Sequence, residues 1–266
     1  ADPDGGKLVR LIEHDGKALL ASAGIAIPRG LLIEASEPPR AAPWPATMVK
    51  AQLLAGGRGK RGLVARAEAA DLAATIGRMT AALAPSASPL LIEEALPVEA
   101  EYYMALRSDD LRQCVSLLLS AQGGVEVENA PAAVQSLPID PRRGLFAQDV
   151  LPIAQAAGIP ARQQGAVARF ASDLNRLFVR ADATLIEINP LALVTKRGLV
   201  ALDAKVVLDD AASFRHPARG ALRSAAIERA AHQSLLAALD VDVPSVVIDG
   251  RRHTRVHRAE GRYYTL

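Results

Sequence analysis

The sequence is poor in the residues that would mark a secreted, membrane-bound or nucleic-acid-binding protein. Its single cysteine, Cys114, excludes an internal disulfide, and beside an apolar segment it is expected to pack rather than react. No apolar run approaches the roughly 18 residues of a membrane span, and no signal-peptide pattern is found. The net charge is only +2 and aromatic residues make up 3% of the chain. We therefore expect a cytoplasmic protein with no membrane and no nucleic-acid partner.

The chain does contain enough apolar material for a substantial core, since half of its residues are apolar. Apolar spacing alternates between helical and extended patterns along most of the length. This mixture predicts an α+β fold. Helices are predicted at 7–23, 67–83, 145–157, 162–180 and 218–239, and strands at 89–96, 99–107, 111–121, 125–128, 184–195 and 199–207.

A glycine-rich, cationic loop follows an apolar strand pattern that carries Lys50. The seven residues from Gly56 to Gly62 include four glycines and three cations. Glycine permits close approach of the backbone, so successive N–H groups can converge on an anion. Arg58 and its cationic neighbours add positive charge, and Lys50 supplies a point charge upstream. The simplest ligand for such a loop is a polyphosphate.

Two common phosphate-binding motifs do not fit this loop. Gly57, Gly59 and Gly62 have the spacing of the dinucleotide fingerprint, but that motif needs a following helix and an acidic residue about twenty positions on. Residues 63–65 instead continue as a strand pattern. A Walker loop fails because Lys60 is not followed by serine or threonine. On this stretch alone, a surface hairpin with solvated cations remains an alternative.

Two later strand patterns carry candidate oxygen ligands. Glu187 and Asn189 alternate with apolar residues and so point to one face, while Asp203 is expected on the partner strand of a hairpin, within cross-strand reach. Carboxylate and amide oxygens there would suit Mg²⁺, completed by phosphate oxygens and water. The alternative is a hydrated sheet face on which Asn189 merely begins a turn. The presence of both features in one chain supports the phosphate- and metal-binding interpretation better than either feature does alone.

Several spaced motifs, in order, resemble the ATP-grasp domain of the β subunit of succinyl-CoA synthetase. The resemblance covers about residues 8–217, and motifs in register are far more specific than any one of them. The motifs are Glu13-His14-Asp15-Gly16-Lys17, Val49-Lys50-Ala51-Gln52 through Gly56-Gly57-Arg58-Gly59-Lys60, Glu93-Glu94-Ala95 with Glu101, Gly123-Gly124-Val125-Glu126, Leu185 to Leu191, Leu202-Asp203-Ala204-Lys205 and Phe214-Arg215-His216-Pro217.

This resemblance implies roles for individual residues at a nucleotide site. Lys50 would contact the phosphates of ATP or GTP, and Gly57-Arg58-Gly59 would form the loop over them. Glu93 would hydrogen-bond the adenine or ribose side of the nucleoside, with Glu101 in the same cleft. Lys50 and Arg58 would be the catalytic residues, because phosphoryl transfer depends mainly on positioning and charge neutralisation.

The resemblance also implies a metal, a partner and a reaction. Asn189 and Asp203 would bind Mg²⁺. The γ-phosphate would be exchanged with a phosphohistidine of an α-like partner subunit, which would also bind CoA. The reaction would join a small carboxylic acid to CoA with release of ADP or GDP, as in an acid–CoA ligase. None of the five histidines of this chain lies in a motif for the phosphorylated one.

The same resemblance implies a domain organisation, from which the C-terminal part departs. An ATP-grasp domain of two α+β lobes, with the nucleotide between them, would cover residues 1–217, with a smaller lobe at about 20–105. A CoA-ligase domain would follow in the family, whereas residues 218–266 predict a helix and a short basic β meander. The chain is then either a fragment or a short module that works with separate partner chains. The tail arginines either bind a partner or protect a strand edge.

Three functions remain open at this point. The leading one is the β-like component of an acyl-CoA synthetase. The others are an ATP-dependent carboxylate–amine ligase acting alone, and a non-catalytic module that binds nucleotide or a partner. Under the leading hypothesis we expect alanine at Lys50 or Asp203 to abolish nucleotide-dependent phosphorylation with the fold intact.

Overall fold

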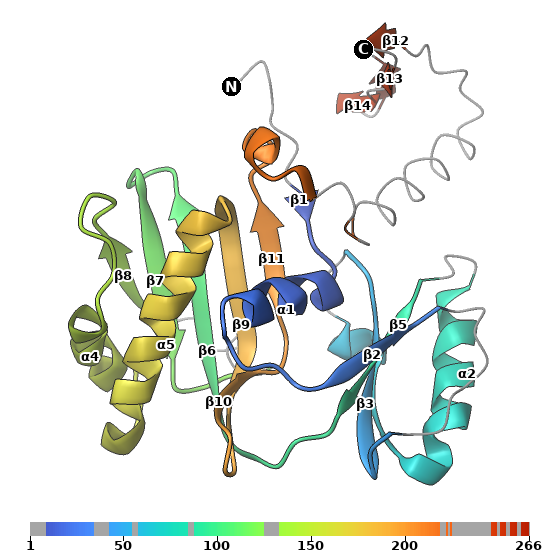
Figure 1. Ribbon diagram of the computed structural model, residues 1–266, viewed down its shortest axis with the longest axis horizontal. Coiled ribbons are helices and arrows are strands. Elements are labelled where there is room, and N and C mark those ends of the chain that lie inside the picture. The colour runs from blue at the N-terminus through green and yellow to red at the C-terminus, as the bar shows by residue number, and fades with distance from the viewer. Residues whose placement is uncertain are drawn as a thin grey trace. The chain divides into compact units, whose positions relative to one another are not determined.

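The computed structural model describes residues 9–34, 43–54, 58–84, 88–124, 133–218, 222 and 224, and four short strands between 246 and 265 (Figure 1). The chain divides into two units, Ala1–Ala225 and Ala226–Leu266. This division does not test the predicted domain boundary at 217 or the predicted limits of the smaller lobe, which stay predictions. Gly57, the strand at 125–128 and the helix at 218–239 lie outside the described residues, apart from isolated positions of that helix.

Seven of the described strands form one antiparallel sheet in the first unit, and helices pack on it (Figure 1). The apolar stripe of the long helix α5 (Ala161–Arg180) is buried in the same core cluster as residues of β6 (Val98–Asp109), β7 (Cys114–Ser120) and β9 (Ala183–Val194). The strand order is β1 (Val9–Arg10), β11 (Lys205–Leu208), β9 (Ala183–Val194), β6 (Val98–Asp109), β7 (Cys114–Ser120) and β8 (Gln135–Ile139), with β10 (Gly198–Ala201) beside β9; the helices are α1 (Glu13–Ser22), α4 (Ala147–Ala156) and α5 (Ala161–Arg180).

A second antiparallel sheet has its own buried cluster. Leu72, Ile76 and Met79 of α2 (Leu72–Leu83) pack there with Val49 and Ile92 of the sheet. The strand order is β2 (Gly30–Ile33), β5 (Leu90–Glu94), β3 (Ala46–Ala51) and β4 (Val64–Glu68), and short 3₁₀ turns lie at Gly59–Arg61, Ala69–Asp71 and Ser213–Arg215. The predicted α+β class is confirmed.

Some predicted boundaries were wrong because sheet pairing overrides local propensity. The helix predicted at 7–23 starts at Glu13, since Val9 and Arg10 pair with β11. The helix predicted from position 67 starts at Leu72, because Ala67 and Glu68 still pair with β3. Among the described residues, no helix is both long and apolar enough to cross a membrane.

The second unit has four described strands, which form two separate hairpins rather than one meander. β12 (Val246–Ile248) pairs with β13 (Arg251–His253), and β14 (Val256–Ala259) pairs with β15 (Arg262–Thr265). The Asp249-Gly250 turn signal thus joins two paired strands, as the sequence indicates.

Candidate functional site

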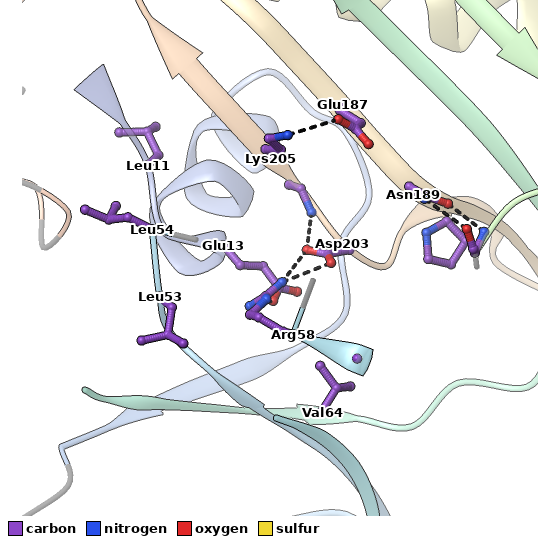
Figure 2. Close-up of a pocket in the computed structure, with 14 residues that line it drawn as sticks. Leu11, Glu13, Leu53, Leu54, Arg58, Val64, Glu187, Asn189, Asp203 and Lys205 are labelled. Atoms are coloured by element: carbon purple, nitrogen blue, oxygen red, sulfur yellow. Dashed lines mark hydrogen bonds and ion pairs between the residues drawn. The ribbon is translucent and has the colours of Figure 1, made fainter. Parts of the chain in front are cut away.

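Two adjoining cavities lie where the first sheet, the second sheet and α1 meet. The first has a volume of about 360 Å³ and the second about 290 Å³, and Val64, Pro190 and Asp203 line both. The first is also lined by Glu13, Arg58, Gly59, Gly124, Glu187, Asn189 and Lys205 (Figure 2), and the second by Met48, Lys50, Glu93, Glu94, Leu96 and Glu101. Every described residue predicted for the site lines one of the two cavities.

Arg58 connects the glycine-rich loop to the hairpin that carries Asn189 and Asp203, across the first cavity (Figure 2). Its Nη2 donates to both carboxylate oxygens of Asp203, at 2.8 and 2.9 Å, and its Nη1 donates to the Ala51 carbonyl at 3.0 Å. Nη1 also lies 2.7 Å from Glu13 Oε2. Burial alone would lower the pKa of Arg58, but Glu13 and Asp203 raise it. Arg58 of the loop and Asp203 of the hairpin are 145 residues apart in sequence, and the two segments therefore meet through a charge-assisted contact.

Asp203 was predicted to lie on a strand at 199–207, and this was wrong. The strand is interrupted at 202–204, between β10 and β11. The reason is that the Leu202 carbonyl accepts hydrogen bonds from the buried Lys17 and Lys50 ammonium groups. The Asp203 carboxylate also accepts from its neighbouring Ala204 N–H at 2.8 Å. Asp203 is consequently held on a turn facing the cavity, with its side chain 37% exposed.

Asn189 is fixed by the double-glycine segment that ends at Gly124. Gly124 N–H donates to Asn189 Oδ1 at 2.6 Å, and Asn189 Nδ2 donates back to the Gly124 carbonyl at 3.1 Å. Gly124 has a φ of +68°, and a Cβ on Gly123 would lie 2.6 Å from the Tyr102 carbonyl oxygen. Only glycine fits both positions without strain. The Gly123-Gly124 motif thus serves to orient the amide of Asn189.

Lys50 lies in a buried ion-pair cluster and is only 7% exposed. Its Nζ is 2.8 Å from Glu13 Oε1 and 2.9 Å from Glu93 Oε2. Glu93, predicted to contact the nucleoside, accepts from Lys17 Nζ at 2.5 and 2.7 Å. Burial alone would raise the pKa of Glu13, but Lys17, Lys50 and Arg58 hold it far below its usual range. Glu13 is therefore charged in the folded protein.

Glu13 and Lys17 were missed as site residues by the sequence analysis. They are spaced i,i+4 on α1, and Lys17 Nζ lies 2.7 Å from Glu13 Oε1. Both side chains are buried on the face of α1 that also buries Leu20. A Glu–Lys pair on the apolar face of a helix was the available signal, because buried charges need partners.

The oxygen donors around the first cavity fit Mg²⁺ that is shared with a phosphate. Glu187, Asn189 and Asp203 line the same cavity. Among the described residues no group of three His, Cys, Asp or Glu side chains is arranged to hold a metal by itself. Mg²⁺ is commonly bound through one or two carboxylates together with substrate phosphates and water. The donor set matches that mode and not a protein-only metal cage.

Glu94, next to Glu93, links the wall of the second cavity to both sheets. Its carboxylate accepts from Arg29 Nη2 at 2.7 Å and from Arg197 Nη1 at 2.6 Å, and Arg197 lies on the turn between β9 and β10. Burial alone would raise the pKa of Glu94, but the hydrogen bonds from Arg29 and Arg197 lower it from 4.5 to about 2. This clamp of Arg29, Glu94 and Arg197 therefore holds one wall of the second cavity against the first sheet.

We predict that Glu94→Gln lowers the free energy of unfolding at pH 7 by about 1–2 kcal/mol, allowing for solvent screening of the exposed arginines. A depressed carboxyl pKa contributes stability above pH 4.5 that is lost as the pH falls toward 2. The difference from wild type should therefore shrink between pH 5 and pH 3 in denaturant titrations. Glu99→Gln, at an exposed position, is the control. A difference independent of pH would contradict the clamp.

Comparison with known proteins places this geometry in a family context. The family model of the ATP-grasp domain matches residues 10–193. The β subunit of succinate–CoA ligase (ADP-forming) from Laribacter hongkongensis is 34% identical over 261 residues, covering 91% of this chain and 66% of that protein. The chain spans 58–66% of the length of the first curated relatives that it matches.

Two solved structures share the fold at lower sequence identity. An ATP citrate lyase from Methanothrix soehngenii, in complex with citrate and coenzyme A, has a TM-score of 0.61 at 24% identity, covering 81% of this chain and 54% of that one. The second is a dinucleotide-forming acetyl-coenzyme A synthetase from Ca. Korarchaeum cryptofilum, solved with coenzyme A, acetyl-coenzyme A and a phosphorylated phosphohistidine segment. It has a TM-score of 0.59 at 18% identity, and the match covers 75% of this chain and 93% of that one.

Proposed function

The chain belongs to the ATP-grasp family, and we propose that it is the nucleotide-binding, β-subunit-like component of an ADP- or GDP-forming acid–CoA ligase. The observation that carries the proposal is the meeting of Arg58 and Asp203 across one cavity. A cationic loop and a set of hard oxygen donors face each other there, which is the arrangement that a metal–triphosphate requires.

The two cavities suggest how the nucleotide is divided between them. We place the nucleoside in the second cavity, beside Glu93, Glu101 and Leu96, and the phosphates in the first. Arg58 would contact phosphate oxygens in the first cavity. Lys50 lines the second cavity but lies 2.8 Å from Glu13 of the first, and it would contact the phosphates where the two cavities adjoin. Gly59 would allow the chain to pass close to them. Asn189 and Asp203 would hold Mg²⁺, which when bound neutralises charge on the phosphates.

The acceptor of the phosphoryl group would come from a partner chain. His14 contacts Asp15, and His216 contacts Asp182 at 2.7 Å; neither lines the two cavities. The relatives are β subunits, and a solved protein of the same fold contains a phosphohistidine segment. We therefore assign the phosphohistidine to an α-like subunit, which would also bind CoA and a small carboxylic acid.

Thermal denaturation with Mg-ATP, Mg-GTP and Mg²⁺ alone tests the nucleotide part of the proposal. A nucleotide at a hundred times its dissociation constant should stabilise the native chain by about 2.7 kcal/mol. Absence of any nucleotide-dependent shift would leave only a non-catalytic module. ADP release that depends on a co-purifying subunit and CoA supports the ligase, whereas ADP release with an amine acceptor and no partner would contradict it.

A further inference from the structure

Lys17 has no place in the roles assigned above, yet it is 2% exposed and contacts two buried carboxylates. Its Nζ contacts Glu13, both oxygens of Glu93, and the Leu202 carbonyl at 2.7 Å. Lys50 Nζ contacts the same three residues. Two ammonium groups therefore share one set of acceptors, although they come from different elements, α1 and β3.

The two lysines differ in their access to the cavities. Lys50 lines the second cavity, and Lys17 lines neither of the two. Only Lys50 is thus placed to exchange a protein carboxylate for a phosphate oxygen. If Lys50 turned away, Glu13 and Glu93 would remain behind, both nearly inaccessible to water. Lys17, which contacts both carboxylates, and Arg58, which contacts Glu13, would then be the cations left beside them. Loss of that compensation would carry a large free-energy cost.

We propose that Lys17 and Glu13 are positioning residues that set how readily Lys50 is released to the nucleotide phosphate. Lys17 compensates the two carboxylates while Lys50 engages phosphate, and Glu13 competes with phosphate for Lys50. This inference rests on the proposed nucleotide site. It assigns opposite effects to two side chains that contact each other on one helix.

The residual charge around Glu93 after release of Lys50 predicts the order of affinities. The formal charge summed over Glu13, Glu93 and Lys17 is −1 in the wild type, −2 in Lys17→Met, 0 in Glu13→Gln, and −1 again in the double variant; Arg58, which also contacts Glu13, is the same in all four proteins and is left out of the sum. Because a buried uncompensated charge opposes the release, nucleotide affinity should fall as this residual charge becomes more negative. The double variant should regain what Lys17→Met alone loses, since both charges are removed together.

Calorimetric titration of Mg-ATP into the four full-length proteins tests this order. Lys17→Met should weaken binding by about tenfold or more, Glu13→Gln should strengthen it by about threefold, and the double variant should lie within about threefold of wild type. Thermal melts of the free proteins report the structural cost separately. Arg176→Met, which removes an exposed ion pair of α5 with Asp173, is the matched control and should bind as wild type.

A purely structural role predicts a different pattern. Both single variants would then lose stability and affinity together, and the double variant would be at least as poor. Weaker binding by Glu13→Gln than by wild type would overturn the inference. This outcome is decisive even if Lys17→Met fails to fold. Absence of Mg-ATP binding by the wild type would refute the proposed site as well, whereas wild-type binding with the wrong order refutes this inference alone.

Discussion

Replacing Lys50 with methionine is expected to weaken Mg-ATP binding by about 100-fold or more, because a charge-assisted contact to phosphate is lost in a site shielded from water. It should also lower the free energy of unfolding by about 3–5 kcal/mol, since Glu13 and Glu93 lose a cation that both of them contact. The sequence alone led us to expect an intact fold for a Lys50 variant. The buried ion pairs make destabilisation the expected result.

Calorimetric titration with Mg-ATP and denaturant titration, performed on the same preparation, separate the two effects. Binding should be measured at a temperature where the variant is still folded, which its circular dichroism spectrum establishes. Lys196→Met, at an exposed turn that lines neither cavity, is the control for loss of a lysine. Unchanged affinity in folded Lys50→Met would remove Lys50 from the site.

Replacing Asp203 with asparagine is expected to abolish most of the Mg²⁺-dependent part of nucleotide binding with little loss of stability. The side chain is 37% exposed, so its ion pair with Arg58 contributes only modestly to folding. The variant removes the carboxylate that would hold Mg²⁺ and at the same time frees Arg58. Phosphoryl transfer should fall by about 10³-fold, because charge neutralisation in the transition state is lost.

The informative measurement is the ratio of ATP dissociation constants in EDTA and in Mg²⁺. We expect a ratio of about 10 or more in the wild type and a ratio near one in Asp203→Asn. Binding in EDTA should persist, since Arg58 remains available to phosphate. Asp71→Asn, at an exposed position between β4 and α2, controls for the loss of a carboxylate. A wild-type ratio in Asp203→Asn would show that the metal lies elsewhere.

The same pair of residues explains why the site was only partly predictable. Arg58 and Asp203 were each recognisable from local sequence, one by its glycine-rich loop and the other by its hairpin and by family resemblance. Their direct contact was not, because nothing local fixes how two segments 145 residues apart approach each other. The interruption of the strand at 202–204 was missed for a similar reason. It depends on lysines that come from α1 and β3.

The sequence by itself determined the α+β class, most of the helices and strands, and the candidate loop and hairpin, because apolar periodicity, glycine and turn residues act over a few neighbouring positions. Only the tertiary structure decided that Glu13 and Lys17 belong to the charge cluster and that Gly124 orients Asn189. Buried charges and amides find their partners through chain packing, and that packing joins residues that no local pattern connects.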